Sequence, residues 1–419
     1  MYFLGIDLGT SYFKAALFNE QGQLCGLGRQ LLEKKTSGQS CELPVDVFWQ
    51  TLHGCVAQAM QQAGAKPDDI RALSYSSQAN SFLLLDKTNE PLTSLILWPD
   101  ARALPAFVTN DSWQQRTGMG MPLTAHSAVN KLMWIRQQHP WLWQQATTVC
   151  TISDYVTLAL TGEKAADGST ASLLGLLDVQ ECAWWEEAMR MAQLPRELLC
   201  PVFYMGMPIG TLSRAGAARL GLSDKTHFSL GGLDHHMAAL GAGLYGTDRT
   251  SESTGTVLAA VQSTTTYQTK QQVWVAPGMH ANHFFRMSFD DNGARPLELY
   301  QKNKAPEYSI EQLLEMAAAG DTDHGKAVRQ LLISTALSLR SLVQRLNSQG
   351  PIVSTGGGAR SALWVQIKAE LLNRPFIIPA CSEAACLGAA MIAAKGIGHL
   401  SNLNDWVNIH KLIEPQIVS

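Results

Sequence analysis

The sequence predicts an α/β protein built from two similar halves that hold one polyphosphate between them. Near the start, the strand-like run 2–7 passes through a glycine- and hydroxyl-rich turn at 8–11 into a second apolar run, 12–18. The turn at 253–256 passes in the same way into the apolar run 257–261. Successive backbone N–H groups in such turns form a concavity that favours an anion. One such turn in each half predicts that the two halves bind the same phosphates.

A third glycine cluster predicts the place of the rest of a nucleotide. Gly356-Gly357-Gly358 follows a strand-like run at 351–355 and precedes a helical pattern at 361–372. Backbone N–H groups at the start of a helix readily bind phosphate and other polar groups. The three turns together therefore predict an enzyme that uses ATP.

The remaining elements alternate between strand and helix in both halves. The β-rich opening predicts an antiparallel meander with strands at 4–7, 13–18 and 24–30. Apolar residues recur at helical spacing in 45–63, which predicts a helix there. The first half is then expected to hold strands at 70–75 and 82–85 and a tryptophan-rich helical stretch at 127–162. The second half is expected to repeat the order, with a strand pair at 250–261, helices at 310–319 and 326–346, a strand at 351–355, a helix at 361–372, a strand at 376–378 and a helix at 383–394.

Length and composition set the number of domains and exclude several classes of partner. A chain of 419 residues has room for two or three domains. Glycines cluster at 231–246, so the predicted boundary separates a domain at 1–230 from a domain at 231–419. The 32 basic and 35 acidic residues nearly cancel, so the chain lacks the basic surface that nucleic acid requires.

The expected location is the cytoplasm. The first residues form a strand rather than a signal peptide, and no apolar run approaches the ~18–20 residues of a membrane helix. The eight cysteines are scattered without a Cys-x-x-Cys pair, which indicates buried thiols in a reducing compartment.

Two motifs that often mark function are given structural interpretations. Residues 241–246 match G-x-G-x-x-G, but the motif follows a helical pattern where the dinucleotide fingerprint follows a strand. We expect the end of a helix there. The pairs His280/His283 and His235/His236 lack the further ligands of a metal site, so they are interpreted as ordinary histidines.

Three charged residues are candidates for chemistry, each with a structural alternative. Asp7 ends a strand before the first turn, and it either caps that turn or faces the phosphates through hydrated Mg²⁺. Lys14 lies on the returning strand and either reaches a phosphate or is solvated. Asp234 follows a glycine pair at the expected seam, and it is either a helix N-cap or the base that accepts the proton of a substrate hydroxyl.

Short motifs follow one another along nearly the whole chain: Asp7-Leu8-Gly9-Thr10, Ser77-Gln78-Ala79-Asn80, Trp98-Pro99-Asp100-Ala101-Arg102, Asp154-Tyr155, Asp167-Gly168-Ser169, Gly232-Leu233-Asp234, Ser253-Thr254-Gly255-Thr256, Gly356-Gly357-Gly358 and Leu387-Gly388-Ala389-Ala390. In this order they resemble the FGGY family of carbohydrate kinases, within the actin-like ATPase superfamily. The resemblance implies two actin-like (ribonuclease H-like) α/β domains with a cleft between them. The first would bind sugar and carry the first phosphate turn, and the second would carry the other phosphate turn and the adenosine site.

The resemblance also implies roles for individual residues. Asp234 would be the catalytic base, and Asp7 would organise Mg²⁺. The residues that would bind ATP are Thr10, Ser11, Lys14, Gly255, Thr256, Gly357 and Gly358. The residues that would contact the sugar are Ala79, Asn80, Asp100, His126 and His235.

The expected activity is ATP-dependent phosphorylation of a hydroxyl of a small ketose or polyol. The alternative is a non-catalytic, actin-like nucleotide-binding regulatory protein, since such folds also serve as switches. Xylulokinase-like members of the family carry Met-His where this chain has Ala79-Asn80, so we expect a substrate other than D-xylulose. The segment 262–326 is shorter than in typical members, so the resemblance does not predict the wall of the adenine pocket. A homodimer remains an alternative to a monomer.

Overall fold

Two seven-stranded sheets form the centres of the two halves in this computed structural model, which describes residues 1–255 and 257–415. The first sheet has the order β14-β15-β6-β1-β2-β3, and β16 also pairs with β6. Its strands are β1 (Tyr2–Leu8), β2 (Tyr12–Phe18), β3 (Leu24–Leu31), β6 (Ile70–Ser77), β14 (Pro208–Thr211), β15 (His227–Ser229) and β16 (Gly232–Leu233). The second sheet has the order β19-β20-β18-β17-β21-β22-β23. Its strands are β17 (Thr250–Thr254), β18 (Leu258–Thr264), β19 (Trp274–Pro277), β20 (Phe284–Asp290), β21 (Ile352–Thr355), β22 (Phe376–Pro379) and β23 (Ile409–Ile413).

The two sheets repeat one arrangement, as the sequence predicts. In the first, the antiparallel strands β3, β2 and β1 are followed by β6, which runs parallel to β1. In the second, the antiparallel strands β20, β18 and β17 are followed by β21, which runs parallel to β17. A crossover helix precedes each parallel strand: α1 (Val45–Ala63) before β6, and α12 (Asp323–Leu346) before β21. The predicted α/β fold with two similar halves is confirmed.

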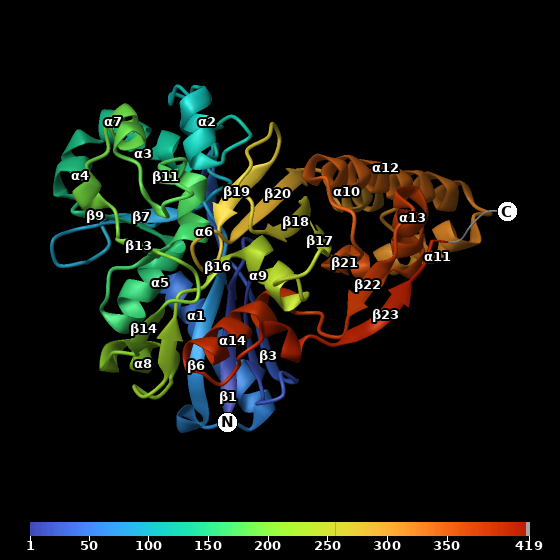
Figure 1. The fold of residues 1–419 in the computed structure, drawn as a ribbon, viewed down its shortest axis with the longest axis horizontal. Helices are drawn as coiled ribbons and strands as arrows, with labels where there is room; N and C mark the ends of the chain where they lie inside the picture. The colour runs from blue at the N-terminus through green and yellow to red at the C-terminus, as the bar shows by residue number, and fades with distance from the viewer. Residues whose placement is uncertain (256, 416–419) are drawn as a thin grey trace.

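Helices surround the two sheets (Figure 1). In the first half they are α2 (Asp111–Thr117), α3 (Ala128–Gln138), α4 (Pro140–Gln145), α5 (Ile152–Thr161), α6 (Gly168–Ala171), α7 (Glu186–Ala192) and α8 (Arg214–Leu220). The later helices are α9 (Asp234–Gly241), α10 (Arg295–Lys304), α11 (Ile310–Ala319), α13 (Ala362–Leu372) and α14 (Ala384–Gly396). Within the described part of the chain, none of the helices combines the length and the apolar character that a bilayer crossing requires.

Helix α14 returns from the end of the chain to the first sheet. Figure 1 shows it across the strands of the first sheet, whereas β22 and β23 lie with the second. The contact is close, because a Cβ added to Gly5 of β1 would lie 1.9 Å from the carbonyl oxygen of Cys386. Helix α14 approaches α9 equally closely through Gly241 and Gly388. The absence of side chains at these glycines lets the helices and the sheet pack backbone to backbone.

A smaller five-stranded sheet lies beside the first, and it corrects one expectation. Its order is β4-β5-β8-β7-β9, with β4 (Lys35–Ser37), β5 (Ser40–Leu43), β7 (Phe82–Leu85), β8 (Leu95–Ile96) and β9 (Thr148–Thr151). The stretch 127–162, expected to be helical throughout, is therefore interrupted by β9. Two physical features explain the break: β-branched residues pair β9 with β7, and a capping box between Thr151 and Asp154 starts α5 afresh.

Two further segments of the second half can be compared with their sequence predictions. Strands β19 and β20 and helix α10 lie between residues 274 and 304, where no elements were predicted. Helix α9 ends at Gly241, and Gly243 and Gly246 follow with φ angles of 82° and 65°. The G-x-G-x-x-G segment is thus a helix end followed by turns, as expected. The short remaining strands are β10 (Ala166–Asp167), β11 (Leu177–Asp178), β12 (Ala183–Trp184) and β13 (Val202–Phe203).

Candidate active site

Two aspartates lie on either side of the carboxyl end of β6. Ser76 of β6 pairs with Asp7 of β1 on one side and with Gly232 of β16 on the other. Strand β16 leads directly into α9, whose first residue is Asp234. In open α/β sheets, ligands bind beyond the carboxyl ends of the parallel strands. The topology therefore places Asp7 and Asp234 at the edge where a ligand is expected.

Asp7 is half-buried and interacts with charges of both signs. Ser76 Oγ donates a hydrogen bond of 2.9 Å to Asp7 Oδ1. Burial raises the pKa of Asp7 to about 6; the positive charge of Lys14 opposes this, and the negative charge of Asp234 adds to it. Two carboxylates close enough to influence one another form a site that a cation would stabilise.

Lys14 forms an ion pair rather than extending into solvent. It is the cross-strand neighbour of Asp7 in the β1–β2 hairpin, and its Nζ donates to Glu383 Oε2 at 2.7 Å. Burial alone would lower the pKa of Lys14, but the charges of Asp7 and Glu383 outweigh it, so the pKa is raised. The ammonium is therefore a fixed positive charge beside the first phosphate turn.

The first phosphate turn, residues 8–11, is bonded to Trp98, for which no individual role was predicted. Trp98 Nε1 donates to Thr10 Oγ1 at 2.6 Å, so the hydroxyl hydrogen of Thr10 remains able to donate. Ser11 is exposed, and its carbonyl oxygen accepts a hydrogen bond from Leu32 N–H at 2.9 Å. Trp98 opens one of the quoted motifs, and its position in that motif is the sequence signal that marks it.

Asp234 does not cap its helix. The apolar residue Leu233 occupies the N-cap position, and Asp234 is the first residue of α9. The carboxylate is half-buried, and its Oδ1 accepts a hydrogen bond of 2.7 Å from His235 N–H. The next side chain joins this helix to the second phosphate turn, because His235 Nδ1 lies 3.3 Å from Ser253 Oγ. The structure thus brings Asp234 and the second turn together.

A buried ion pair is bonded to the second phosphate turn, residues 253–256, through Thr254. The side chains of Glu252 and Lys368 are fully buried, with Lys368 Nζ donating to Glu252 Oε1 at 2.7 Å and to Thr254 Oγ1 at 2.8 Å. The hydroxyl of Ser354 on β21 also donates to Glu252 Oε1, and that of Thr355 donates to the backbone carbonyl of Glu252. Strand β21 leads to the third glycine cluster, so this network joins the two turns of the second half that are predicted to bind the nucleotide. Thr256, predicted to bind ATP, lies outside the described residues.

The third glycine cluster packs directly on the second turn. Gly356 has a φ of 76°, and Gly357 begins a short 3₁₀ helix, Gly357–Arg360. A Cβ added to Gly358 would lie 2.7 Å from Thr254 Cβ. The predicted nucleotide residues Gly255, Gly357 and Gly358 are therefore neighbours in space. A larger side chain at 358 would separate the two turns.

The predicted sugar-contacting residues differ in burial and in their bonding partners. Asn80 has a φ of 58°, and its Oδ1 accepts a hydrogen bond of 2.9 Å from Ala128 N–H at the start of α3. Ala79 is buried beside it, and His126 is exposed with its ring 6.0 Å from that of Trp98. Trp98 therefore contacts both His126 and Thr10 of the turn at 8–11.

Asp100 is engaged by other parts of the protein. Its fully buried carboxylate accepts hydrogen bonds from the Arg102 side chain at 2.6–3.0 Å and from Cys41 N–H at 2.8 Å. Burial alone would raise the pKa of Asp100, but these hydrogen bonds outweigh it and hold the pKa below its usual value. The predicted contact between Asp100 and a substrate remains a prediction.

A buried lysine joins two segments of this region and was not identified from the sequence. Lys131 Nζ donates to the carbonyl oxygens of Asn80 at 3.0 Å and Leu97 at 2.9 Å. Burial lowers the pKa of Lys131 to about 7. A lysine within a predicted amphipathic helix carries no local signal of such a role, because both of its acceptors come from distant segments.

Comparison with known proteins identifies the family. Residues 2–241 match the N-terminal domain of the FGGY family of carbohydrate kinases, and residues 317–397 match its C-terminal domain. The chain belongs to the FGGY family of carbohydrate kinases. The resemblance drawn from the motifs is confirmed, and with it the assignment as a carbohydrate kinase. The predicted boundary between 230 and 231 remains a prediction.

Relatives and solved structures agree with this assignment. The FGGY kinase is 26% identical to the xylulose kinase of Bacillus subtilis strain 168, over 96% of this chain and 90% of the relative. It is also 26% identical to the autoinducer-2 kinase of Escherichia coli K12, over 96% and 87%. Its fold matches xylulose kinase from Rhodospirillum rubrum with a TM-score of 0.88 at 22% identity, covering 100% of this chain and 95% of the other. The glycerol kinase of Plasmodium falciparum with ADP matches with a TM-score of 0.86 at 15% identity, covering 99% and 94%. The two relatives at 26% identity favour the kinase over the non-catalytic alternative.

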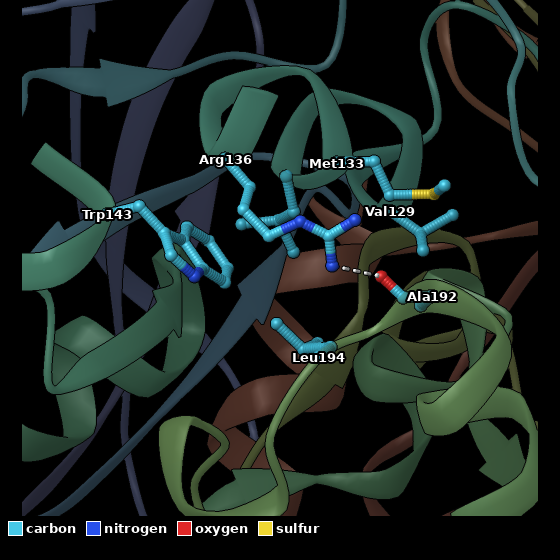
Figure 2. A pocket seen from close by; sticks show the side chains of 7 residues that line it. Val129, Met133, Arg136, Trp143, Ala192 and Leu194 are labelled. Atoms are coloured by element: carbon cyan, nitrogen blue, oxygen red, sulfur yellow. Dashed lines mark hydrogen bonds between the residues drawn. The ribbon is translucent and has the colours of Figure 1, made fainter. Parts of the chain in front are cut away.

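Two depressions in the FGGY kinase lie apart from the candidate site. Figure 2 shows the first, where Arg136 of α3 donates to the carbonyl of Ala192; it also donates to the carbonyl of Gln193. This arginine satisfies carbonyl groups at the end of α7, which is a structural role. The second is a cavity of about 640 Å³ lined by the segments 202–208 and 279–281 and the end of α14. Neither shares a lining residue with the site.

Proposed function

We propose that this FGGY kinase transfers the γ-phosphoryl group of ATP to a hydroxyl of a small ketose or polyol, with Asp234 as the general base. The observation that carries the proposal is the placement of Asp7 and Asp234 on either side of the carboxyl end of β6, with the second phosphate turn bonded to the next residue, His235. Phosphoryl transfer depends mainly on positioning and charge stabilisation, and this arrangement supports both.

Asp234 is suited to accept the proton of the attacking hydroxyl. Its Oδ1 is bonded to His235 N–H, which orients the carboxylate at the start of α9. In the proposed step the substrate oxygen bonds to the γ-phosphorus, the bond from that phosphorus to the bridging oxygen of ADP breaks, and the hydroxyl proton passes to Asp234. The products are the sugar phosphate and ADP.

The phosphates of ATP are proposed to lie between the two glycine turns. Backbone N–H groups of the turns and the fixed charge of Lys14 would bind the phosphate oxygens. Thr10 and Ser11 would contribute from the first half, and Gly255 and Thr256 from the second. Gly357 and Gly358 would lie against the adenosine, since they pack on the second turn.

Mg²⁺ is proposed to bind beside Asp7. The donor set fits, because the half-buried carboxylate of Asp7 has a raised pKa and lies near a second negative charge, Asp234. Protein-bound Mg²⁺ usually takes one or two carboxylates and keeps several waters. When bound, it would neutralise the charge that develops on the β- and γ-phosphate oxygens.

The proposed substrate is a ketose or sugar alcohol other than D-xylulose. Asn80 uses its amide oxygen to bind Ala128 N–H, which leaves its NH₂ group to donate to a substrate hydroxyl. Ala79 leaves space where xylulokinase-like members carry methionine. The relatives named above include a xylulose, an autoinducer-2 and a glycerol kinase, so the family itself accommodates several small polyhydroxy substrates. A cytoplasmic location and a homodimer remain predictions.

The decisive experiment measures ADP release from ATP with and without a panel of ketopentoses, ketohexoses, tetruloses, glycerol and aldonates. We expect one class to raise turnover far above the rate with ATP alone and to yield a phosphorylated product. ATP turnover that no member of the panel stimulates would contradict the proposed substrate class.

A further inference from the structure

One buried hydroxyl group bonds the chain on both sides of Asp234. Leu233 N–H donates to Ser169 Oγ at 3.0 Å, and the same oxygen lies 2.8 Å from His236 Nδ1. Leu233 directly precedes Asp234, and His236 follows it by two positions. Ser169 and His236 are fully buried, and Leu233 is 2% exposed. Ser169 belongs to α6, so a separate element holds the first turn of α9 in place.

The hydroxyl of Ser169 has the capacity for both of its partners. Ser169 Oγ accepts the Leu233 N–H, and it still has a hydrogen and a second lone pair with which to bond His236 Nδ1. Burial lowers the pKa of His236 well below its ordinary value, and the nearby His235 and His283 add to this, so the ring is neutral. A neutral ring carries its hydrogen on either Nδ1 or Nε2, and both tautomers can bond Ser169 Oγ through Nδ1. Among residues 1–255 and 257–415, no partner bonds this buried Nε2.

The ring of His236 also packs on the second sheet. It stacks on Phe285 of β20 with the ring centroids 4.5 Å apart and on Trp274 of β19 at 5.3 Å, with interplanar angles of 18° and 20°. An apolar side chain would fill the same space without leaving a buried nitrogen unpaired, which costs roughly 1–3 kcal/mol. The bond that an apolar side chain could not make here is the one to Ser169.

We propose that Ser169 and His236 are positioning residues that fix the direction of the Asp234 carboxylate; this inference rests on the proposed role of Asp234 as the base. A general base must lie within ~2.6–3.2 Å of the atom whose proton it accepts. A displacement of ~1 Å can lower the rate by ~100-fold. Because the bonds from Ser169 flank Asp234, their loss moves the carboxylate without removing any group that touches substrate.

The first test compares two variants that each remove a fully buried hydroxyl. Ser169→Ala removes the bonds beside Asp234. Thr226→Val removes the bond from Thr226 Oγ1 to the Ile70 carbonyl, at the opposite end of β6 from Ser76. We expect similar losses of melting temperature, but kcat at least ~10-fold lower in Ser169→Ala alone, with KM for ATP and sugar within ~2-fold of wild type.

The second test replaces the ring. His236→Asn places an amide oxygen near the position of Nδ1, where it accepts from Ser169, whereas His236→Leu keeps the bulk without an acceptor. We expect Asn to retain kcat within ~3-fold and Leu to lose as much as Ser169→Ala. The double variant Ser169→Ala/His236→Leu should lose no more than either single change, because residues that act through one bond are not additive.

Two results would overturn the inference: equal kcat in Ser169→Ala and Thr226→Val, or full kcat in His236→Leu. Asp234→Asn, assayed in parallel, separates this failure from failure of the proposed function. An inactive Asp234→Asn beside a fully active His236→Leu rejects only the positioning role. An active Asp234→Asn rejects the base itself and the positioning role with it.

Discussion

Lys14 Nζ lies 2.7 Å from Glu383 Oε2, although 369 positions separate the two residues in the chain. Lys14 belongs to the hairpin that carries the first phosphate turn, and Glu383 directly precedes α14. The return of α14 to the first sheet makes the ion pair, and the pair in turn holds a positive charge beside that turn. Glu383, from the second half of the chain, thus contacts the candidate site through Lys14.

The ion pair leads to a prediction about ATP. Lys14→Met should raise KM for ATP and lower kcat by at least ~10-fold, because a fixed positive charge near the phosphates is lost. Glu383→Gln should have a milder effect, since its amide oxygen still accepts the bond. Steady-state kinetics at varied ATP measure both, with Lys225→Met as an exposed control. Unchanged ATP kinetics in Lys14→Met would show that the lysine serves only the fold.

Asp234→Asn should abolish phosphoryl transfer and leave sugar binding largely intact. The substitution keeps the size of the side chain and removes general-base assistance worth ~10²–10⁴-fold. Turnover and sugar titration calorimetry measure the two properties separately, and Asp224→Asn, at a half-exposed surface pair, is the control. A rate above about a tenth of wild type would reject Asp234 as the base.

The raised pKa of Asp7 predicts a pH-dependent requirement for Mg²⁺. The metal binds the ionised carboxylate, and a pKa of about 6 means that protons compete below that pH. The Mg²⁺ concentration for half-maximal activity should therefore rise by up to ~10-fold for each pH unit below 6. Asp7→Ala should require more Mg²⁺ at pH 7 and lose this dependence, and Thr10→Ala should act on the nucleotide side alone. A Mg²⁺ requirement that is the same in Asp7→Ala and wild type would make the role of Asp7 structural.

The same shift has a consequence for stability, with its sign fixed by the direction of the shift. Between the ordinary pKa of 3.8 and about 6, the folded protein binds more protons at Asp7 than the unfolded chain does. Stability contributed by this residue therefore falls as pH rises through that window. Asp7→Asn should melt at a higher temperature than wild type at pH 7, and the difference should vanish at pH 4.

Lys368→Met should destabilise the protein strongly. It leaves the buried carboxylate of Glu252 without its ion-pair partner, which costs about 3–5 kcal/mol. The double variant Glu252→Gln/Lys368→Met removes both charges and should recover at least half of the lost melting temperature. Equal melting temperatures in the single and double variants would mean that packing, rather than the unpaired charge, sets the cost.

Asn80→Ala should lower kcat/KM on the true substrate by at least ~10-fold, because a hydroxyl loses its partner in the site. The positive φ of Asn80 and its bond to Ala128 make a structural control necessary. Asn80→Asp keeps the accepting oxygen and tolerates this backbone conformation, but it lacks the donating NH₂ group. It should keep the melting temperature and still lose kcat/KM. Preference for D-xylulose, or indifference to both changes, would reject this interpretation of the pocket.

The sequence alone determined what depends on neighbours along the chain. The hairpin at the first phosphate turn follows from two apolar runs around a glycine turn, and α11 (Ile310–Ala319) matches its predicted range because Ser309 and Gln312 form a capping box. Hydrogen bonds within a hairpin or a helix join residues a few positions apart, so composition and spacing predict them. The order of such motifs also identified the family.

Tertiary structure alone decided which side chains meet. The bonds of Lys14 to Glu383, of Trp98 to Thr10 and of Ser169 to both sides of Asp234 join distant segments. So does the engagement of Asp100, a predicted substrate contact, by Cys41 N–H. These contacts form only when separate elements pack against each other. The local sequence around a side chain does not indicate which residue of a distant segment it will bond. The sequence therefore proposed candidate residues for the site, and packing determined which other residues they contact.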